Sequence, residues 1–152
     1  MKIVINKCFG GFSLSPKAIK RMAELQGREC YFFENDFKTD KYIPLPFEKT
    51  EKRRFLFFQA FDIPNPNEVL KAGKMTEKEK KEHNELYEKH SLERYPDDRT
   101  NPFLIKVVED LGDEASESCA ELKIVEIPDG IEWEIDDYDG METIHEKHRS
   151  WG

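Results

Sequence analysis

A glycine pair near the start of the chain has the residue types of an anion-binding turn. Gly10 and Gly11 follow the β-favouring residues 3–5, and Ser15 and Pro16 then give the signals that begin a helix. Glycine lets the backbone approach a ligand closely, and the N–H groups of a strand–turn–helix unit bind phosphate and other anions. The sequence predicts a ligand site here or, alternatively, an ordinary tight connection between a strand and a helix.

The residues around the glycine pair extend this candidate site. Phe9 and Phe12 are suited to stack on a base or to pack in the core, and Ser13 follows them directly. The longer phosphate-binding pattern that ends in Gly-Lys-Ser/Thr is absent, and so is G-x-G-x-x-G. The turn therefore has the glycines of a nucleotide site without the rest of its signature.

A second anion-binding candidate lies at Arg99, Thr100 and Asn101, directly before a predicted helix. A guanidinium group and the N–H groups of a helix N-terminus both favour negative charge. The alternative is a capping network in which Arg99 pairs with an acidic neighbour. If both candidates lie at one sheet edge, they line one pocket, with the ligand-binding residues Phe9, Gly10, Gly11, Phe12, Ser13, Arg99, Thr100 and Asn101.

No complete catalytic or metal-binding signature is present. His145 and His148 follow an acidic stretch but are three residues apart, whereas zinc-binding helices use a spacing of four. Residues 136–140 lack the full calcium-loop pattern, and Cys8 beside the glycine turn has no base that the sequence identifies. The sequence thus predicts no catalytic residue, metal or cofactor, and it favours a binding protein over an enzyme. A solvated acidic turn and buried cysteines are the alternatives.

Three helices are predicted from their end signals. Ser15, Pro16 and Gly27 delimit the first, and a helix over residues 102–111 begins at Thr100 or Asn101 and ends before Gly112. Thr76 with Glu79 forms a capping box before the charged residues 77–90. Residues 104, 107, 108 and 111 form an apolar stripe, whereas residues 77–90 hold little that is apolar.

The apolar pattern predicts the strands. Residues 28–33 form one, residues 35–50 a loop or irregular edge, and residues 53–61 a central strand buried on both faces. Residues 120–127 and 131–136 form a hairpin, Asp139-Gly140 a further turn, and residues 141–151 a short helix or tail. The expected fold is α/β or α+β. It is a single domain over residues 1–152 with a mixed sheet, two main packed helices and a charged helical insertion at about 69–99.

Charge is distributed unevenly along the 152 residues. The net charge is −8, but residues 101–152 hold 4 Lys/Arg against 15 Asp/Glu, whereas the first hundred residues carry +3. Such an acidic half disfavours direct nucleic-acid binding. It leaves open a basic protein partner, a cation, mimicry of DNA, or simply a solvated surface.

The remaining totals bound the class of protein. Aromatic residues are 12% of the chain, which provides large buried areas and disfavours disorder throughout. The three cysteines, Cys8, Cys30 and Cys119, show no C-x-x-C spacing, which predicts free thiols in a reducing compartment. No apolar run reaches the roughly 20 residues of a membrane span, and no signal peptide is evident. The expected location is the cytoplasm, with no membrane partner.

Distinctive motifs lie at both ends of the chain, at residues 2–15, 99–102, 122–140 and 145–151. Through these motifs, about the first 35 and the last 55 residues resemble a family of small proteins common in bacteriophage and prophage genomes. The resemblance implies a viral or prophage accessory protein in a bacterial cytoplasm.

That context gives three hypotheses. The first is sequestration, without catalysis, of an anionic nucleotide-like signal of host defence. The second is an acidic interaction module that inhibits a host protein, and the third is a nucleotide- or nucleoside-processing enzyme. The sequence leaves homo-oligomerisation open.

Overall fold

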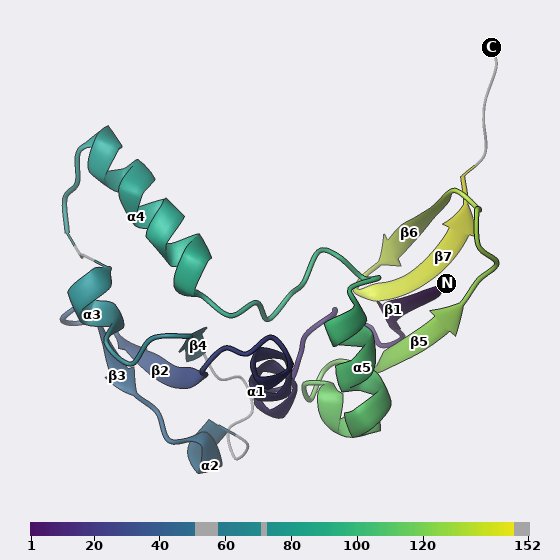
Figure 1. Cartoon of the computed structure of the whole chain (residues 1–152), viewed down its shortest axis with the longest axis horizontal. Coiled ribbons are helices and arrows are strands. Elements are labelled where there is room, and N and C mark those ends of the chain that lie inside the picture. The colour runs from purple at the N-terminus through teal and green to yellow at the C-terminus, as the bar shows by residue number, and fades with distance from the viewer. Residues whose placement is uncertain (51–57, 71–72, 148–152) are drawn as a thin grey trace. The chain divides into compact units, whose positions relative to one another are not determined.

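The structure is a computed structural model that describes residues 1–50, 58–70 and 73–147 (Figure 1). The chain divides into two compact units: Met1–Met22 with Arg94–Gly152, here the terminal unit, and Ala23–Glu93, the middle unit. That residues 1–152 form a single domain stays a prediction.

The helices are α1 (Pro16–Leu25), α2 (Phe47–Thr50), α3 (Pro66–Val69), α4 (Glu77–His90), α5 (Pro102–Leu111) and a 3₁₀ turn, Gly112–Ala115. The predicted caps of the three long helices are confirmed. Ser15, Thr76 and Asn101 each accept a hydrogen bond from a first-turn N–H, at 3.1, 3.2 and 2.9 Å. Local sequence signals therefore fix these helix starts, and α4 and α5 span the predicted residues.

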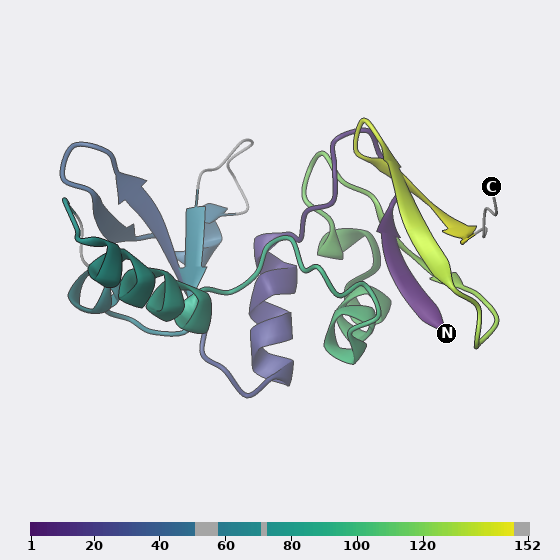
Figure 2. The ribbon, with the colours of Figure 1, turned by 90° about the horizontal axis from the view of Figure 1, so that it is seen from above.

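The terminal unit is built on an antiparallel pair, β1 (Lys2–Asn6) with β5 (Leu122–Glu126), against which α5 packs (Figures 1 and 2). The apolar stripe of α5 is buried, except for the half-buried Leu111. The buried apolar side chains shared by these three elements are Ile3, Val4, Ile5, Leu104, Val107, Val108 and Leu122. The core of this unit therefore joins the two ends of the chain.

The C-terminal hairpin differs from the prediction. β6 (Trp133–Tyr138) pairs with β7 (Met141–Glu146), and β7 lies beside β1 (Figures 1 and 2). The predicted hairpin of residues 120–127 with 131–136 is therefore wrong, as is the predicted helix or tail after residue 140; residues 148–151 lie outside the described residues. Asp139 and Gly140 turn the chain with φ of +51° and +91°. A two-residue turn with positive φ at both positions matches strand twist, and Asp-Gly favours it.

The middle unit holds a three-stranded antiparallel sheet in the order β3 (Lys41–Pro44), β2 (Tyr31–Asp36), β4 (Phe58–Phe61). β2 is the centre, so the prediction that residues 53–61 form the central strand is wrong; residues 53–57 of that stretch lie outside the described residues. β4 is at the edge of the sheet, and an isolated bridge joins Phe61 on its outer side to Ser91. β3 falls in the stretch predicted as a loop or irregular edge.

An aromatic cluster forms the core of the middle unit. Phe33, Phe61 and Leu70 are buried, and Leu86 and Tyr87 of α4 pack against them. The Phe61 and Tyr87 rings meet edge to face, with centroids 5.8 Å apart. No residue of α4 is buried, as predicted for a charged helix, yet its two apolar side chains anchor it to this cluster.

The fold is α+β. Every strand pair in the described residues is antiparallel, so the expected mixed sheet is replaced by small antiparallel sheets. Within residues 1–50, 58–70 and 73–147, no helix combines the length and apolarity that spanning a bilayer requires.

Candidate functional site

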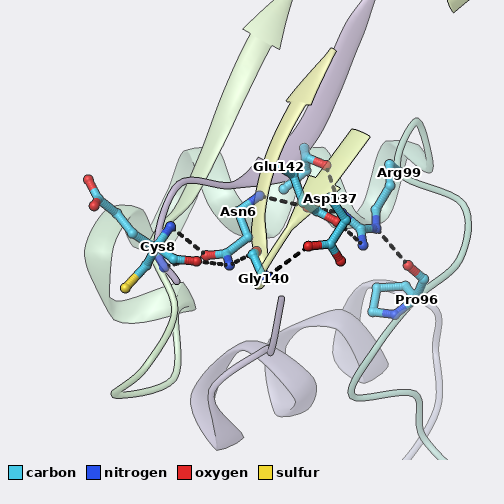
Figure 3. A network of polar contacts seen from close by, with 9 residues as sticks. Asn6, Cys8, Pro96, Arg99, Asp137, Gly140 and Glu142 are labelled. Atoms are coloured by element: carbon cyan, nitrogen blue, oxygen red, sulfur yellow. Dashed lines mark hydrogen bonds and ion pairs between the residues drawn. The ribbon is translucent and has the colours of Figure 1, made fainter. Parts of the chain in front are cut away.

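Asn6, the last residue of β1, is the centre of a buried polar network in the terminal unit (Figure 3). Its Nδ2 donates to the carbonyl oxygens of Cys8 and Gly140, both at 2.7 Å. Its Oδ1 accepts from the N–H groups of Cys8 at 3.3 Å and Glu121 at 2.8 Å. All four hydrogen-bonding positions of the amide are used. The side chain thus ties β1 to the glycine turn, to the residue before β5 and to the β6–β7 turn.

A buried ion pair continues this network. Arg99 Nη1 and Nη2 donate to the two carboxylate oxygens of Glu142 at 2.6 and 2.9 Å, and the side chains are only 16% and 7% exposed. Glu142 Oε1 also accepts from the N–H of Asn6 at 2.8 Å. Arg99 Nε donates to the Pro96 carbonyl at 3.1 Å. The guanidinium charge is therefore balanced within the chain, which is the capping-type alternative that the sequence left open.

Phe12 lies against the same guanidinium group. The Cζ of Arg99 is 3.7 Å from the centroid of the Phe12 ring, a cation–π contact, and Phe12 is buried. The structure thus places Arg99 against Phe12 of the glycine-turn segment, and that the two segments line one ligand pocket stays a prediction. Glu142 takes the place on Arg99 that an anion would need.

The glycine turn itself packs against backbone. A Cβ on Gly140 would come within 2.6 Å of the Phe9 carbonyl and 2.8 Å of the Gly11 Cα, and a Cβ on Gly10 would collide with Cys119. These glycines are therefore needed for the close approach of the turn to the β6–β7 hairpin and to Cys119. That requirement supports the tight-connection alternative.

The other predicted ligand residues have partners within the chain. Ser13 Oγ donates to Glu117 at 3.2 Å, and Thr100 donates from both N and Oγ1 to Asp98, at 3.0 and 2.7 Å. Asn101 caps α5. These three residues therefore stabilise local structure with the same groups that a ligand would contact.

The two central partners, Asn6 and Glu142, were missed by the sequence-based interpretation. The sequence does hold a signal for Glu142. It lies two residues before Ile144 in the segment after the Asp-Gly turn, so on a strand the two side chains share one face, and the apolar Ile144 marks that face as inward. Asn6 follows three buried apolar residues, Ile3, Val4 and Ile5, and a polar residue at such a position needs hydrogen-bonding partners. Neither signal identifies Arg99 as the partner, because the three residues come from distant parts of the chain.

The predicted metal and thiol candidates are resolved differently. His145 lies on a strand rather than a helix, is exposed, and meets Asp136 at 3.1 Å, while His148 lies outside the described residues. The described residues hold no group of three or more metal-ligating side chains. Cys8 and Cys119 carry free thiols, as predicted. The predicted burial of the cysteines is wrong, because Cys8 and Cys30 are half-buried and Cys119 is exposed.

An exposed aromatic pair lies on the rim of the network. Phe9 and Tyr138 are 57% and 76% exposed, and their rings meet edge to face with centroids 6.5 Å apart. Asp136, Asp137 and Asp139 surround Tyr138 along the chain and are exposed. Residues 130–146 hold seven carboxylates and no Lys or Arg. These five residues, Phe9, Asp136, Asp137, Tyr138 and Asp139, are here called the aromatic–acidic patch.

The middle unit contains a second titratable cluster. Asp62 accepts from Arg28 Nη2 at 3.0 Å, and its other oxygen lies 2.9 Å from His90 Nδ1. Partial burial raises the pKa of the Asp62 carboxyl, but the hydrogen bonds from His90 and Arg28 outweigh burial, so this pKa lies below its usual value. The cluster joins the residues before β2 and after β4 to the end of α4.

Comparison with protein families, characterised proteins and solved structures gives no match to this chain. The similarity to phage proteins therefore remains a prediction from the sequence.

Proposed function

We propose that the chain is a non-catalytic interaction module that engages a basic surface of a partner protein through the aromatic–acidic patch. The observation that carries the proposal is the contact between two exposed rings, Phe9 beside the glycine turn and Tyr138 on the β6–β7 hairpin. Residues 130–146, which hold this hairpin, contain no Lys or Arg. Exposed aromatic side chains are the residues from which protein interfaces gain most affinity. Carboxylates around them favour a basic partner and speed its association.

The balance of charge favours this function over anion capture. Arg99 is neutralised by Glu142, whereas the patch carboxylates Asp137 and Asp139 are open to solvent. A ligand phosphate at Arg99 would have to compete with a bidentate carboxylate inside the same fold. In the phage context that the sequence suggests, the partner is a basic protein of the bacterial host.

Capture of an anionic nucleotide-like ligand remains the second candidate. Its support is the Phe9 ring, which is exposed beside the glycine turn and available to stack on a base. Such a ligand would bind without Arg99, so Arg99 would contribute to the fold rather than to affinity.

One experiment separates the two candidates. The immobilised protein is exposed to a bacterial lysate, and proteins retained by wild type but lost with the double variant Phe9→Ala/Tyr138→Ala are identified by mass spectrometry. The purified partner is expected to bind at least about 30-fold more weakly to this variant, because truncating two interface anchors costs about 2 kcal/mol or more. Added salt is expected to weaken binding to wild type.

A second variant removes only charge from the patch: Asp136→Asn/Asp139→Asn is expected to slow association with the partner. Its matched control, Glu82→Gln/Glu85→Gln on exposed α4, removes the same number of charges outside the patch and is expected to leave association unchanged. A thermal-shift panel of nucleotides, cyclic dinucleotides and ADP-ribose tests the second candidate. A shift with intact ligand, together with no protein retained in a patch-dependent way, would reject the interaction module.

A further inference from the structure

The outer edge of β3 is closed by a side chain. Asn67 of α3 accepts a hydrogen bond from the N–H of Tyr42 through Oδ1 and donates to the Tyr42 carbonyl through Nδ2, both at 2.8 Å. This is the pair of bonds that a neighbouring strand would make to one residue of an edge strand. Figure 1 shows α3 beside β3 in the middle unit.

The register shows why one side chain is enough. The N–H of Leu45 donates to Phe32 of β2, so residues 41, 43 and 45 direct their backbone groups toward β2. Tyr42 and Pro44 therefore direct theirs outward. Pro44 has no N–H, which leaves the N–H of Tyr42 as the outward donor of β3, and Asn67 occupies it.

The surroundings of this edge are those of an association-prone strand. Ile43 on β3 is 42% exposed, and Phe37 in the β2–β3 turn is 78% exposed. An open edge with apolar side chains pairs readily with another chain, and proteins protect such edges with charge, proline or a covering segment. Lys41 and Pro44 provide the first two devices here, and the Asn67 amide acts as the third.

We propose that Asn67 is an edge cap that prevents β3 from pairing with β3 of a second copy of this chain. Antiparallel pairing about a two-fold axis would set Tyr42 and its neighbours against the same residues of the other copy. The inference concerns the middle unit and is independent of the proposed function of the aromatic–acidic patch.

The test compares Asn67→Ala with Asn65→Ala by sedimentation over a range of protein concentrations. Asn65 precedes the same helix, and its side chain donates to Glu68 at 2.8 Å rather than to β3. Asn67→Ala is expected to raise the self-association constant at least about tenfold over wild type, since two backbone groups become free for a partner. Asn65→Ala is expected to match wild type. Equal masses for both variants at every concentration would overturn the proposal.

Further substitutions at Asn67 and Ile43 test whether the association runs through the edge of β3. Asn67→Asp still accepts from Tyr42 N–H, so it is expected to associate less than Asn67→Ala; if the alanine variant does not fold, Asn67→Ser replaces it. Adding Ile43→Lys to the associating variant is expected to return it to the wild-type mass, because the lysine charges would face each other across the new pair. Association that persists with Ile43→Lys would place the contact elsewhere and reject the edge cap.

Discussion

The Arg99–Glu142 pair of the terminal unit and the Arg28–Asp62 pair of the middle unit differ in burial. Arg99 and Glu142 in the terminal unit are 16% and 7% exposed, whereas Arg28 and Asp62 in the middle unit are 31% and 21% exposed. The first pair lies within a buried polar network around Asn6. The second pair is half-buried, and its Asp62 also contacts His90 at the end of α4. An Arg–carboxylate pair is thus part of the buried interior in the terminal unit, whereas in the middle unit it is half-buried and open to solvent on one side.

The difference teaches how each unit closes. The terminal unit joins the two ends of the chain, and the bond from Asn6 to Glu142 spans 136 residues. A network of such reach forms only when the whole unit is assembled, because Asn6, Arg99 and Glu142 come from segments far apart in the chain. The core of the middle unit is made of aromatic rings that meet edge to face or at a tilt. Its polar cluster adds a link between the end of α4 and the residues that flank β2 and β4.

Removing the buried carboxylate gives the largest expected effect. Glu142→Ala leaves Arg99 charged and buried and the N–H of Asn6 without its acceptor. Breaking a buried pair from one side costs about 3–5 kcal/mol in unfolding free energy. Denaturant unfolding followed by circular dichroism measures it, with the exposed Glu134→Ala on the same hairpin as the control. A similar loss of unfolding free energy in Glu142→Ala and Glu134→Ala would mean that the buried carboxylate stabilises the fold no more than an exposed one.

The same variant also tests the predicted single domain. Amide exchange in β2 of the middle unit is expected to accelerate in Glu142→Ala if the two units unfold together. Unchanged exchange in β2, together with faster exchange in β1, would instead show two independently folding units.

The glycine contact gives the second effect. Gly140→Ala is expected to cost about 3 kcal/mol, because its Cβ would meet Phe9 and Gly11 and its φ of +91° is strained for alanine. Gly130→Ala is the control, since its φ is +80° but no atom lies within 4 Å of the added Cβ. That variant is expected to cost about 1 kcal/mol. Equal costs in thermal or denaturant unfolding would assign the whole effect to backbone strain and remove the packing argument for the turn.

The Arg28–Asp62–His90 cluster is expected to contribute less to the unfolding free energy than the buried network does, and its contribution is expected to depend on pH. Asp62→Asn removes the charge that Arg28 and His90 share, at a cost of about 1–2 kcal/mol at neutral pH. Because the pKa of Asp62 is lowered in the folded state, its contribution is present above the usual carboxyl pKa of about 3.9 and is lost as pH falls through the folded value. The difference in unfolding free energy between wild type and variant should therefore shrink in acid. A difference that is the same at about pH 7 and about pH 3 would remove the charge as its cause.

The sequence predicted features that depend on a few neighbouring residues. The caps at Ser15, Thr76 and Asn101 and the stripe of α5 are local, because a helix satisfies its own backbone bonds. The Asp139-Gly140 turn was located for the same reason. Its role as the centre of a hairpin was not, because the residues after it were assigned to a helix or tail.

Strand partners could not be predicted in this way. Pairing of β1 with β5 joins residues more than a hundred positions apart, and nothing in either strand specifies the other. The apolar run that ends in β4 is compatible with a central strand, but its outer side is met by His90–Leu92 instead of another strand. Arg99 was identified as the notable cation, whereas its partner Glu142 depends on the three-dimensional arrangement of three segments.

The smallest expected effect is that of removing a helix cap, and it differs between α4 of the middle unit and α5 of the terminal unit. α4 has no buried residue, so its first turn depends on the cap at Thr76, whereas α5 is also held by its buried stripe. Thr76→Ala is expected to cost about 1 kcal/mol locally, which corresponds to roughly fivefold faster amide exchange in the first turns of α4. Thr76→Ser keeps the hydroxyl and is expected to exchange like wild type. The equivalent change Asn101→Ala should alter exchange in α5 less, because its buried side chains oppose fraying; a larger effect in α5 would show that capping outweighs burial in this fold.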